Sequence, residues 1–285
     1  MVTLPSTAEA VPAARRHVRE LAACFTANSL LTAASAIAFQ LLVALIPLTF
    51  LALVLMGAFS VEEIWRDDVA PFVRERFTIT TAVGVNRAVE RMMAEYALFW
   101  IVVAVALTLW QVSGSVRAAM GALNRIYGVE EERPFVRRFA LSFALAAGVA
   151  ACVLGALFAA TLGGRVIPGP VPTILVSVVT WGLALVLLWL VIAMMIRFGP
   201  VRGGEIGLVS IGSLLVIGGW LAATLAYGVY VRYVVDFESS FGIASALFLL
   251  TGYLYYSSII FLTGVQVDQL RRDGGRIGRD GRRAA

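Results

Sequence analysis

Lysine is absent from this chain of 285 residues, so all 23 basic side chains are arginine. Charged residues make up only 14% of the chain, whereas soluble globular domains have about 25%. Cysteine occurs twice, at Cys24 and Cys152, and histidine once, at His17. Such isolated residues supply neither a disulfide framework nor the ligand spacing of a His/Cys metal site. The scarcities exclude an ordinary soluble domain, and we expect no metal and no cofactor.

Hydrophobic residues make up 60% of the chain, and its mean hydropathy is +0.88. Apolar runs of roughly 18 residues or more are typical of transmembrane helices. The fold class is therefore expected to be an all-α integral membrane protein with six transmembrane helices in a membrane domain of residues 31–267. The expected spans cover residues 31–59, 96–112, 139–162, 173–196, 206–230 and 242–265.

Four polar segments flank or interrupt these spans. Residues 1–30 form an N-terminal segment with an amphipathic helix, which lies either on lipid headgroups or against the protein's own loops. Residues 60–95 alternate charged residues with helical apolar stripes and are expected to form an outer helical cap. Residues 113–138 are expected to form a cytoplasmic amphipathic helix, and residues 268–285 a disordered basic tail.

Arginine placement predicts the orientation. With the N-terminus inside, sixteen of the 23 arginines fall in inner segments, and most of the others lie in the acidic cap. Because cytoplasmic loops carry the excess of basic residues, we expect both termini to be cytoplasmic.

Several polar or helix-distorting residues lie within or at the ends of the spans. Gln40 is expected either to bond across helices or to line a polar cavity, and Pro47 to kink or break the first span. Gln111 ends the second span. Tyr253 lies near the middle of the last span together with Tyr255 and Tyr256. Hydroxyls at this depth need partners, so these three side chains are expected to face the bundle. Asp268 lies just beyond the end of that span.

Two spans carry rows of small residues. Ala144, Gly148 and Cys152 recur every four residues in the third span, with Ala147 and Ala151 in a neighbouring row. The fifth span has a similar face. Such faces favour close helix–helix approach, either within the chain or between copies in a homo-oligomer.

The stretch from Leu107 to Phe139 combines an apolar stripe with a polar face. The stripe contains Val116, Met120, Leu123 and Tyr127, and the neighbouring polar face is formed by Arg117, Gly121, Asn124 and Arg125. Gly128 is placed to end the helix, and Pro134 suits the first turn of the next one.

Several motifs in this order resemble the YihY/BrkB family of bacterial inner-membrane proteins over roughly residues 20–270. They are Ser35 to Phe39 with Pro47, Ser113 to Arg117, Ala122 to Glu130, Arg133 to Phe135, Phe237 to Gly242, and Gly264 to Asp268. Family members often carry other residues at several positions of these motifs. They have an aromatic pair at Phe39-Gln40, tyrosines at Phe237 and Phe241, a Glu near Gln266 and an Asn near Asp268.

The resemblance implies a six-helix envelope protein of the bacterial inner membrane. The family has no agreed biochemical activity, and its members have been linked to serum resistance, transport and lipid handling. Some carry an old ribonuclease BN label. The residues give that label no support, because no His/Asp metal constellation occurs and the acidic residues mostly lie in the outer cap. We therefore expect neither an enzyme nor a nucleic-acid partner.

Two functions remain in competition. The first is transport or lipid handling at the cell envelope, with membrane lipids as partners. The second is a non-catalytic membrane scaffold that docks a partner through the outer cap or the cytoplasmic helix. We predict no catalytic residue. The candidate pathway or binding residues are Gln40, Pro47, Gln111, Arg117, Asn124, Arg125, Tyr253, Gln266 and Asp268.

Overall fold

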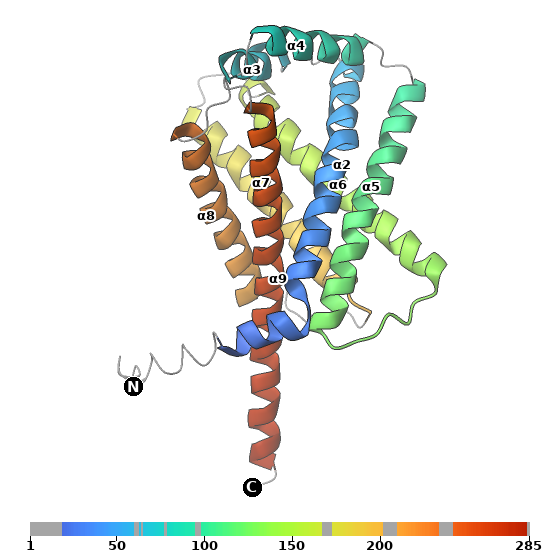
Figure 1. Ribbon diagram of the computed structural model, residues 1–285, viewed down its shortest axis with the longest axis vertical. Helices are drawn as coiled ribbons and strands as arrows, with labels where there is room; N and C mark the ends of the chain where they lie inside the picture. The colour runs from blue at the N-terminus through green and yellow to red at the C-terminus, as the bar shows by residue number, and fades with distance from the viewer. Residues whose placement is uncertain are drawn as a thin grey trace.

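The computed structural model describes residues 19–59, 63, 65–76, 79–94, 98–166, 173–201, 210–233 and 242–283. Six long helices in these ranges are long and apolar enough to cross a membrane (Figure 1). This confirms the predicted fold class. The six are α2 (Leu30–Ala58), α5 (Leu98–Ile126), α6 (Phe135–Val166), α7 (Thr173–Phe198), α8 (Ile211–Tyr233) and α9 (Gly242–Arg283).

Short helices lie across one end of the bundle, which we call the cap end (Figure 1). They are a π-helical turn, η1 (Trp65–Val69), followed by α3 (Ala70–Arg76) and α4 (Ile79–Ala94). Trp65 packs with Val89 and Met93 of α4 against Leu53 and Met56 of α2. The helices predicted for the cap therefore have an apolar core of their own, continuous with the first span.

We call the opposite end the terminal end, because residues 19–27 and the last turns of α9 lie there (Figure 1). Residues 19–27 are helical and run across the bundle axis. Phe25 of this helix packs against the main core, as expected of a helix whose apolar face is turned to the protein. The first 18 residues of the predicted amphipathic segment lie outside the described residues.

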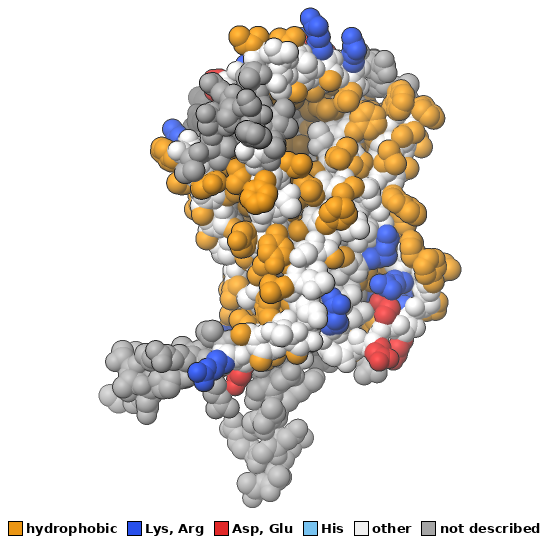
Figure 2. Space-filling view, in the orientation of Figure 1, with side chains coloured by type: hydrophobic (Ala, Val, Ile, Leu, Met, Phe, Trp, Pro, Cys, Tyr) orange, Lys and Arg blue, Asp and Glu red, His pale blue; other side chains and the backbone are white. Residues whose placement is uncertain are grey.

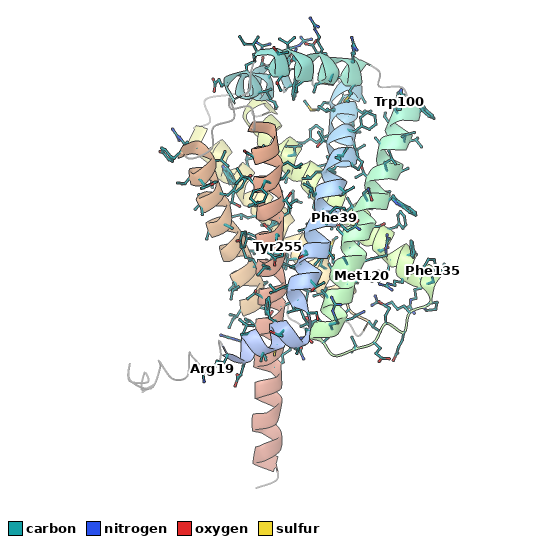
Figure 3. All side chains as sticks on the ribbon, in the orientation of Figure 1. Arg19, Phe39, Trp100, Met120, Phe135 and Tyr255 are labelled. Carbon is teal, nitrogen blue, oxygen red and sulfur yellow. The ribbon has the colours of Figure 1, made fainter. Side chains whose placement is uncertain are left out.

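The main core lies toward the terminal end and is built from α2, α5, α6, α7, α8 and α9. Val116, Met120 and Leu123 of α5 are at most 3% exposed, which confirms the apolar stripe predicted for this helix. Met120 points into the bundle in Figure 3. On the face that Figure 2 shows, hydrophobic side chains cover the middle of the molecule, and arginine and acidic side chains lie toward its two ends.

The predicted break between the second span and a cytoplasmic helix is wrong. α5 continues without interruption through residue 112 to Ile126. Ser113 and Ser115 do not end the helix, because each hydroxyl donates to the carbonyl three residues earlier, at Trp110 and Val112. The polar residues after 112 therefore belong to the same helix as the second span, which is long and apolar enough to cross a membrane. Only residues 127–134 form a connection before α6.

The predicted disordered tail also differs from the structure, in which α9 continues as a helix to Arg283. Once a long span has formed, each added residue gains a backbone hydrogen bond without a new nucleation step. Arginine is also a good helix former and no proline interrupts the segment, although its four glycines disfavour a helix. The first span was predicted to kink or break at Pro47. In the structure α2 continues as a helix through Pro47, so the span is not broken there.

Candidate functional site at the terminal end of the bundle

The residues selected from the sequence fall on three helices and form separate groups. Gln40 and Pro47 lie on α2, and Gln111, Arg117, Asn124 and Arg125 on α5. Tyr253, Gln266 and Asp268 lie on α9. The groups around Arg117, Asn124 and Asp268 have the most extensive polar contacts.

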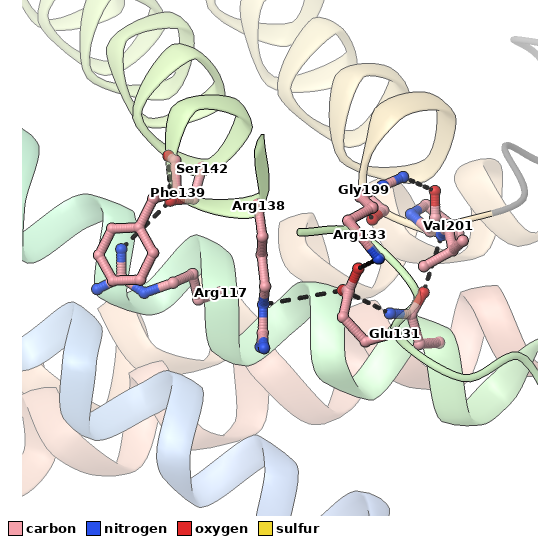
Figure 4. A network of polar contacts seen from close by, with 10 residues as sticks. Arg117, Glu131, Arg133, Arg138, Phe139, Ser142, Gly199 and Val201 are labelled. Atoms are coloured by element: carbon pink, nitrogen blue, oxygen red, sulfur yellow. Dashed lines mark hydrogen bonds and ion pairs between the residues drawn. The ribbon is translucent and has the colours of Figure 1, made fainter. Parts of the chain in front are cut away.

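Arg117 reaches from α5 to the first turns of α6 (Figure 4). Its Nη1 donates to Ser113 Oγ at 2.8 Å and to Ser142 Oγ at 3.2 Å. The guanidinium carbon lies 4.4 Å from the centre of the Phe139 ring, within the range of a cation–π contact. Ser113 and Ser142 donate their own protons to the carbonyls of Trp110 and Phe139, so their lone pairs face Arg117.

Gln40 approaches the same place from α2 because residue 114 is a glycine. A Cβ at position 114 would lie 2.8 Å from Gln40 Oε1 and 3.8 Å from Arg117 Nη2. The side chain of Gln40 therefore occupies space that any other residue at 114 would need. α2, α5 and α6 converge here around one guanidinium group.

Arg117 has no carboxylate partner among the described residues. Ser113 and Ser142 are fully buried but neutral. Arg138, the residue before Phe139 on α6, lies close enough to Arg117 for the two positive charges to repel each other. The Nε of Arg138 is 3.8 Å from Glu131 Oε2. Positive charge therefore exceeds negative charge around Arg117.

Asn124, two turns beyond Arg117 on α5, has a different environment. Its Nδ2 donates to Glu131 Oε2 at 3.0 Å, and its Oδ1 accepts from the Val201 backbone N–H at 3.0 Å. Asn124 is 4% exposed. Its carboxamide joins α5 to the connection before α6 and to the turn after α7, so the geometry supports a structural role.

Arg133 strengthens the same junction (Figure 4). Its Nη1 donates to the Gly199 carbonyl at 3.0 Å, and its Nη2 donates to the Pro200 carbonyl. Glu131 Oε1 accepts from the Arg133 backbone N–H at 3.4 Å. Glu131 thus serves Asn124, Arg133 and Arg138 together, and it is not available to neutralise Arg117.

Asp268 caps α8 from α9. Its Oδ1 accepts from the Gly212 N–H at 2.8 Å, one of the first amides of α8, which have no partner within their own helix. Its Oδ2 is buried without a hydrogen-bond partner, and so is the hydroxyl of Tyr127. Burial raises the pKa of the Tyr127 phenol well above its usual range. The charge of Arg272 opposes this shift and that of Asp268 adds to it.

Gln266 ties α9 to the start of α2. Its Oε1 accepts from Asn28 Nδ2 at 3.1 Å, and the side chain is 3% exposed. The polar end of α9 therefore holds α8 through Asp268 and the entry to α2 through Gln266.

The remaining candidates are placed elsewhere. Tyr253 shares a 2.9 Å hydrogen bond with Thr224 of α8, so its hydroxyl has the expected partner. Tyr256 is 62% exposed, which contradicts the expectation that the neighbouring tyrosines also face the bundle. The Pro47 carbonyl accepts from Thr108 at 3.0 Å.

Gln111 is half-buried and Arg125 exposed, and neither joins the groups described above. Sequence reasoning missed three contributors to the Arg117 group, namely Gly114, Phe139 and Ser142. Ser113, four residues before Arg117, lies on the same helix face and was detectable by that spacing. Ser142 lies 25 residues away across a turn, and no sequence pattern relates it to Arg117.

Within the parts of the chain that the structure describes, no group of three or more His, Cys, Asp or Glu side chains is placed to hold a metal ion. Cys24 and Cys152 are both free thiols.

Comparisons with known proteins confirm the family resemblance. Residues 22–284 match the family model described as Virulence factor BrkB. The chain is also similar to the "Putative ribonuclease-like protein YfkH" of Bacillus subtilis (strain 168), with 24% identity over 170 residues. The similarity covers 57% of this chain and 62% of YfkH, so the chain spans less than two thirds of that relative's length. No solved structure matches the chain.

Proposed function

The chain belongs to the Virulence factor BrkB family, and on that premise we propose that it acts in transport or lipid handling at the bacterial inner membrane. In this proposal Arg117 contacts the substrate, which carries a negative charge. One observation carries the proposal. A guanidinium group within a membrane-spanning helix has hydroxyl and aromatic neighbours but no carboxylate partner among the described residues.

A charged side chain costs about 2.5 to 3.5 kcal/mol at the centre of a membrane helix on insertion scales, and less toward the helix ends. Arg117 lies between the centre and the terminal end of α5. The hydroxyls of Ser113 and Ser142 satisfy part of the hydrogen-bonding capacity of Arg117 but contribute no opposite charge. A protein that serves only as a scaffold has no need for such a group. A substrate anion would offset the charge, and for this reason we favour a binding role for Arg117.

The orientation is part of the proposal. With both termini in the cytoplasm, the terminal end faces the cytoplasm, and the arginine excess lies on the side that membrane insertion favours. Arg117 then lies in the inner half of the membrane, where a substrate arriving from the cytoplasm or from the inner leaflet would meet it.

The proposed role requires no covalent chemistry, and we propose that the chain is not an enzyme. The ribonuclease-like wording belongs to the name of YfkH. The groups best placed to act as acids or bases, Glu131 and Asp268, are engaged in structural hydrogen bonds.

Reconstitution in liposomes tests the proposal. Wild-type protein should move a labelled anionic lipid between leaflets or an anion across the membrane. Arg117→Gln should abolish this movement, whereas the exposed Arg125→Gln, on the same helix, should leave it intact. Equal rates for empty liposomes and for liposomes with wild-type protein, across both substrate classes, would refute transport.

A second candidate, a scaffold that docks a partner through the cap, is favoured by a different observation. A hollow of about 410 Å³ between α3 and α4 is lined by Arg74, Arg87, Ile79 and Val83, among others. Ile79 is 84% exposed, which is unusual for a large apolar residue outside the membrane-spanning helices. A photo-crosslinking side chain at Val83 should capture one stoichiometric protein from intact cells if this candidate is correct.

A further inference from the structure

The Arg117 group is continuous with a row of aromatic rings on the α5–α6 side of the bundle. Phe135 and Phe139 have ring centres 4.3 Å apart, and Phe139 and Phe143 6.5 Å apart. Phe143 in turn lies 6.3 Å from Trp110 of α5. The row therefore begins on the first turn of α6 and crosses to the neighbouring helix.

Both ends of this row are open to the surroundings. Phe135 is 72% exposed and Trp110 58% exposed, and Phe135 stands at the outer edge of the bundle (Figure 3). α6 is strongly tilted, and its first turns lie apart from the other helices (Figure 1). The aromatic row is thus accessible from the side of the bundle, where the lipid lies.

The direction of the row relative to Arg117 distinguishes a lipid from a water-soluble anion. α5 runs from the cap end to the terminal end, and Trp110 precedes Arg117 by seven residues, or about 10 Å along the helix. From the guanidinium group, the Phe139–Phe143–Trp110 portion therefore extends toward the middle of the membrane. A lipid of the leaflet at the terminal end has the same polarity, with its headgroup outward and its acyl chain inward.

The donors of Arg117 suit a phosphate oxygen. A guanidinium group presents five N–H donors in a planar fork that matches phosphate. The hydroxyls of Ser113 and Ser142 hold Nη1. Among the described residues, Nη2 and Nε have no hydrogen-bond partner. The nearby Arg138 pairs through its Nε with Glu131 Oε2 at 3.8 Å, so the positive charge left unpaired in this group is that of Arg117.

We propose that Arg117, held by Ser113, Ser142 and Phe139, binds the phosphate of a phospholipid that enters sideways between α5 and α6. One acyl chain of this lipid then lies along Phe143 and Trp110. The inference rests on the proposed function and specifies its substrate class. The recognised chemistry is a phosphate group, and the adjoining aromatic row assigns it to a lipid headgroup rather than to free phosphate.

Native mass spectrometry of the full-length protein in detergent tests this assignment. Dioleoyl phosphatidylglycerol is the probe, dioleoylglycerol is the same lipid without phosphate, and inorganic phosphate is the competitor. Wild-type protein and Arg125→Gln should retain one phosphatidylglycerol and no dioleoylglycerol. Arg117→Gln should lower retention about tenfold, as expected for loss of one charge-assisted bidentate contact. Inorganic phosphate should not displace the lipid.

Equal retention by Arg117→Gln and Arg125→Gln would overturn the inference, and displacement by inorganic phosphate would assign the site to a soluble anion. If Arg117→Gln does not yield folded protein, Arg117→Lys decides, because it keeps the charge but loses the planar fork and the stacking on Phe139. Lower retention by Arg117→Lys supports the inference, and unchanged retention overturns it.

The acyl-chain contact has a separate readout. One equivalent of phosphatidylglycerol with brominated chains should quench tryptophan fluorescence, and Trp110→Phe should remove most of the quenched component. Unchanged quenching in Trp110→Phe would overturn the placement of the chain. Arg117-dependent anion flux in liposomes without any lipid retention would overturn this inference alone and leave the transport proposal standing.

Discussion

Asp268 offers the sharpest test of how the terminal end is held together. Its Oδ1 accepts from the Gly212 N–H at 2.8 Å, whereas its Oδ2 is buried without a partner. Replacement by alanine removes the acceptor and leaves the Gly212 amide unsatisfied at the start of α8. Replacement by asparagine keeps the oxygen that accepts from Gly212 and removes only the negative charge. The two substitutions therefore separate the hydrogen bond from the charge.

The expected magnitudes follow from these contacts. Loss of a helix-capping acceptor costs about 0.5 to 2 kcal/mol, and a buried donor left without a partner costs about 1 to 3 kcal/mol. Asp268→Ala should therefore lower the free energy of unfolding by roughly 1 to 3 kcal/mol. Asp268→Asn loses a charge-assisted bond but no longer buries an unpaired carboxylate oxygen. The two effects oppose each other, so the free energy of unfolding of Asp268→Asn should stay within about 1 kcal/mol of the wild-type value.

Thermal unfolding of the purified protein, followed by tryptophan fluorescence, is the assay. For domains of 150–250 residues, 1 kcal/mol shifts Tm by about 2 to 4 °C, so Asp268→Ala should unfold roughly 2 to 12 °C lower. The exposed Arg271→Ala on α9 is the control and should show almost no shift. An Asp268→Asn variant as unstable as Asp268→Ala would refute the reasoning, because the charge and not the hydrogen bond would then carry the stability.

Three further predictions concern other parts of the chain. Tyr127→Phe should not lower stability, because the buried hydroxyl has no hydrogen-bond partner. Burial raises the folded-state pKa of the Tyr127 phenol, so its stabilising contribution is complete below about pH 10 and is lost as the pH rises further. Raising the pH above that value should lower the free energy of unfolding of the wild type more than that of Tyr127→Phe. In a cysteine-free background, Asp67→Cys should react with a membrane-impermeant reagent from outside the cell and Arg279→Cys should not; the opposite pattern would refute the orientation. Ala147 and Ala151 face outward from α6, so Ala151→Cys should form a disulfide between two copies if this row of small residues joins a homo-oligomer, and a purely monomeric product would count against it.

Hydropathy was sufficient to predict that six segments could span a membrane, because about 20 apolar residues at 1.5 Å each match the thickness of a bilayer. For the fourth span the expected residues 173–196 compare with Thr173–Phe198 in the structure. The ability of a segment to span a bilayer depends on its own composition and length and does not depend on tertiary contacts. The cap was predictable for a similar reason, since its apolar stripes repeat with helical period.

Hydropathy failed where polar residues continue a helix. The Ser113-Gly114-Ser115 sequence lowers the local hydropathy and suggests an end to the second span. In the structure the serine hydroxyls bond to carbonyls of the preceding turn, so the helix accommodates them without exposing unsatisfied groups. The error matters for function, because it placed Arg117 on a separate helix instead of on the continuation of the second span.

The partners of each polar residue could not be predicted, because they come from distant segments. Asn124 accepts from Val201, 77 residues later, and Arg117 donates to Ser142, 25 residues later. Helical periodicity determines which side chains share a face, but not which residues of another helix lie opposite. Only the packing of α5 against α6 and the turn after α7 supplies that information.

The sequence analysis treated the polar face of α5 as one candidate site, but its residues have different partners in the structure. Arg117, Asn124 and Arg125 all lie on the predicted polar face of α5. Asn124 uses both ends of its carboxamide within the protein, and Arg125 is exposed, where its charge is solvated. Arg117 alone combines partial burial with a charge that no described carboxylate offsets. Groups whose hydrogen bonds are complete stabilise the fold, whereas a half-buried charge without a counter-ion gains free energy when an anion binds to it. The hypothesis that the polar face of α5 binds a substrate is therefore now restricted to Arg117.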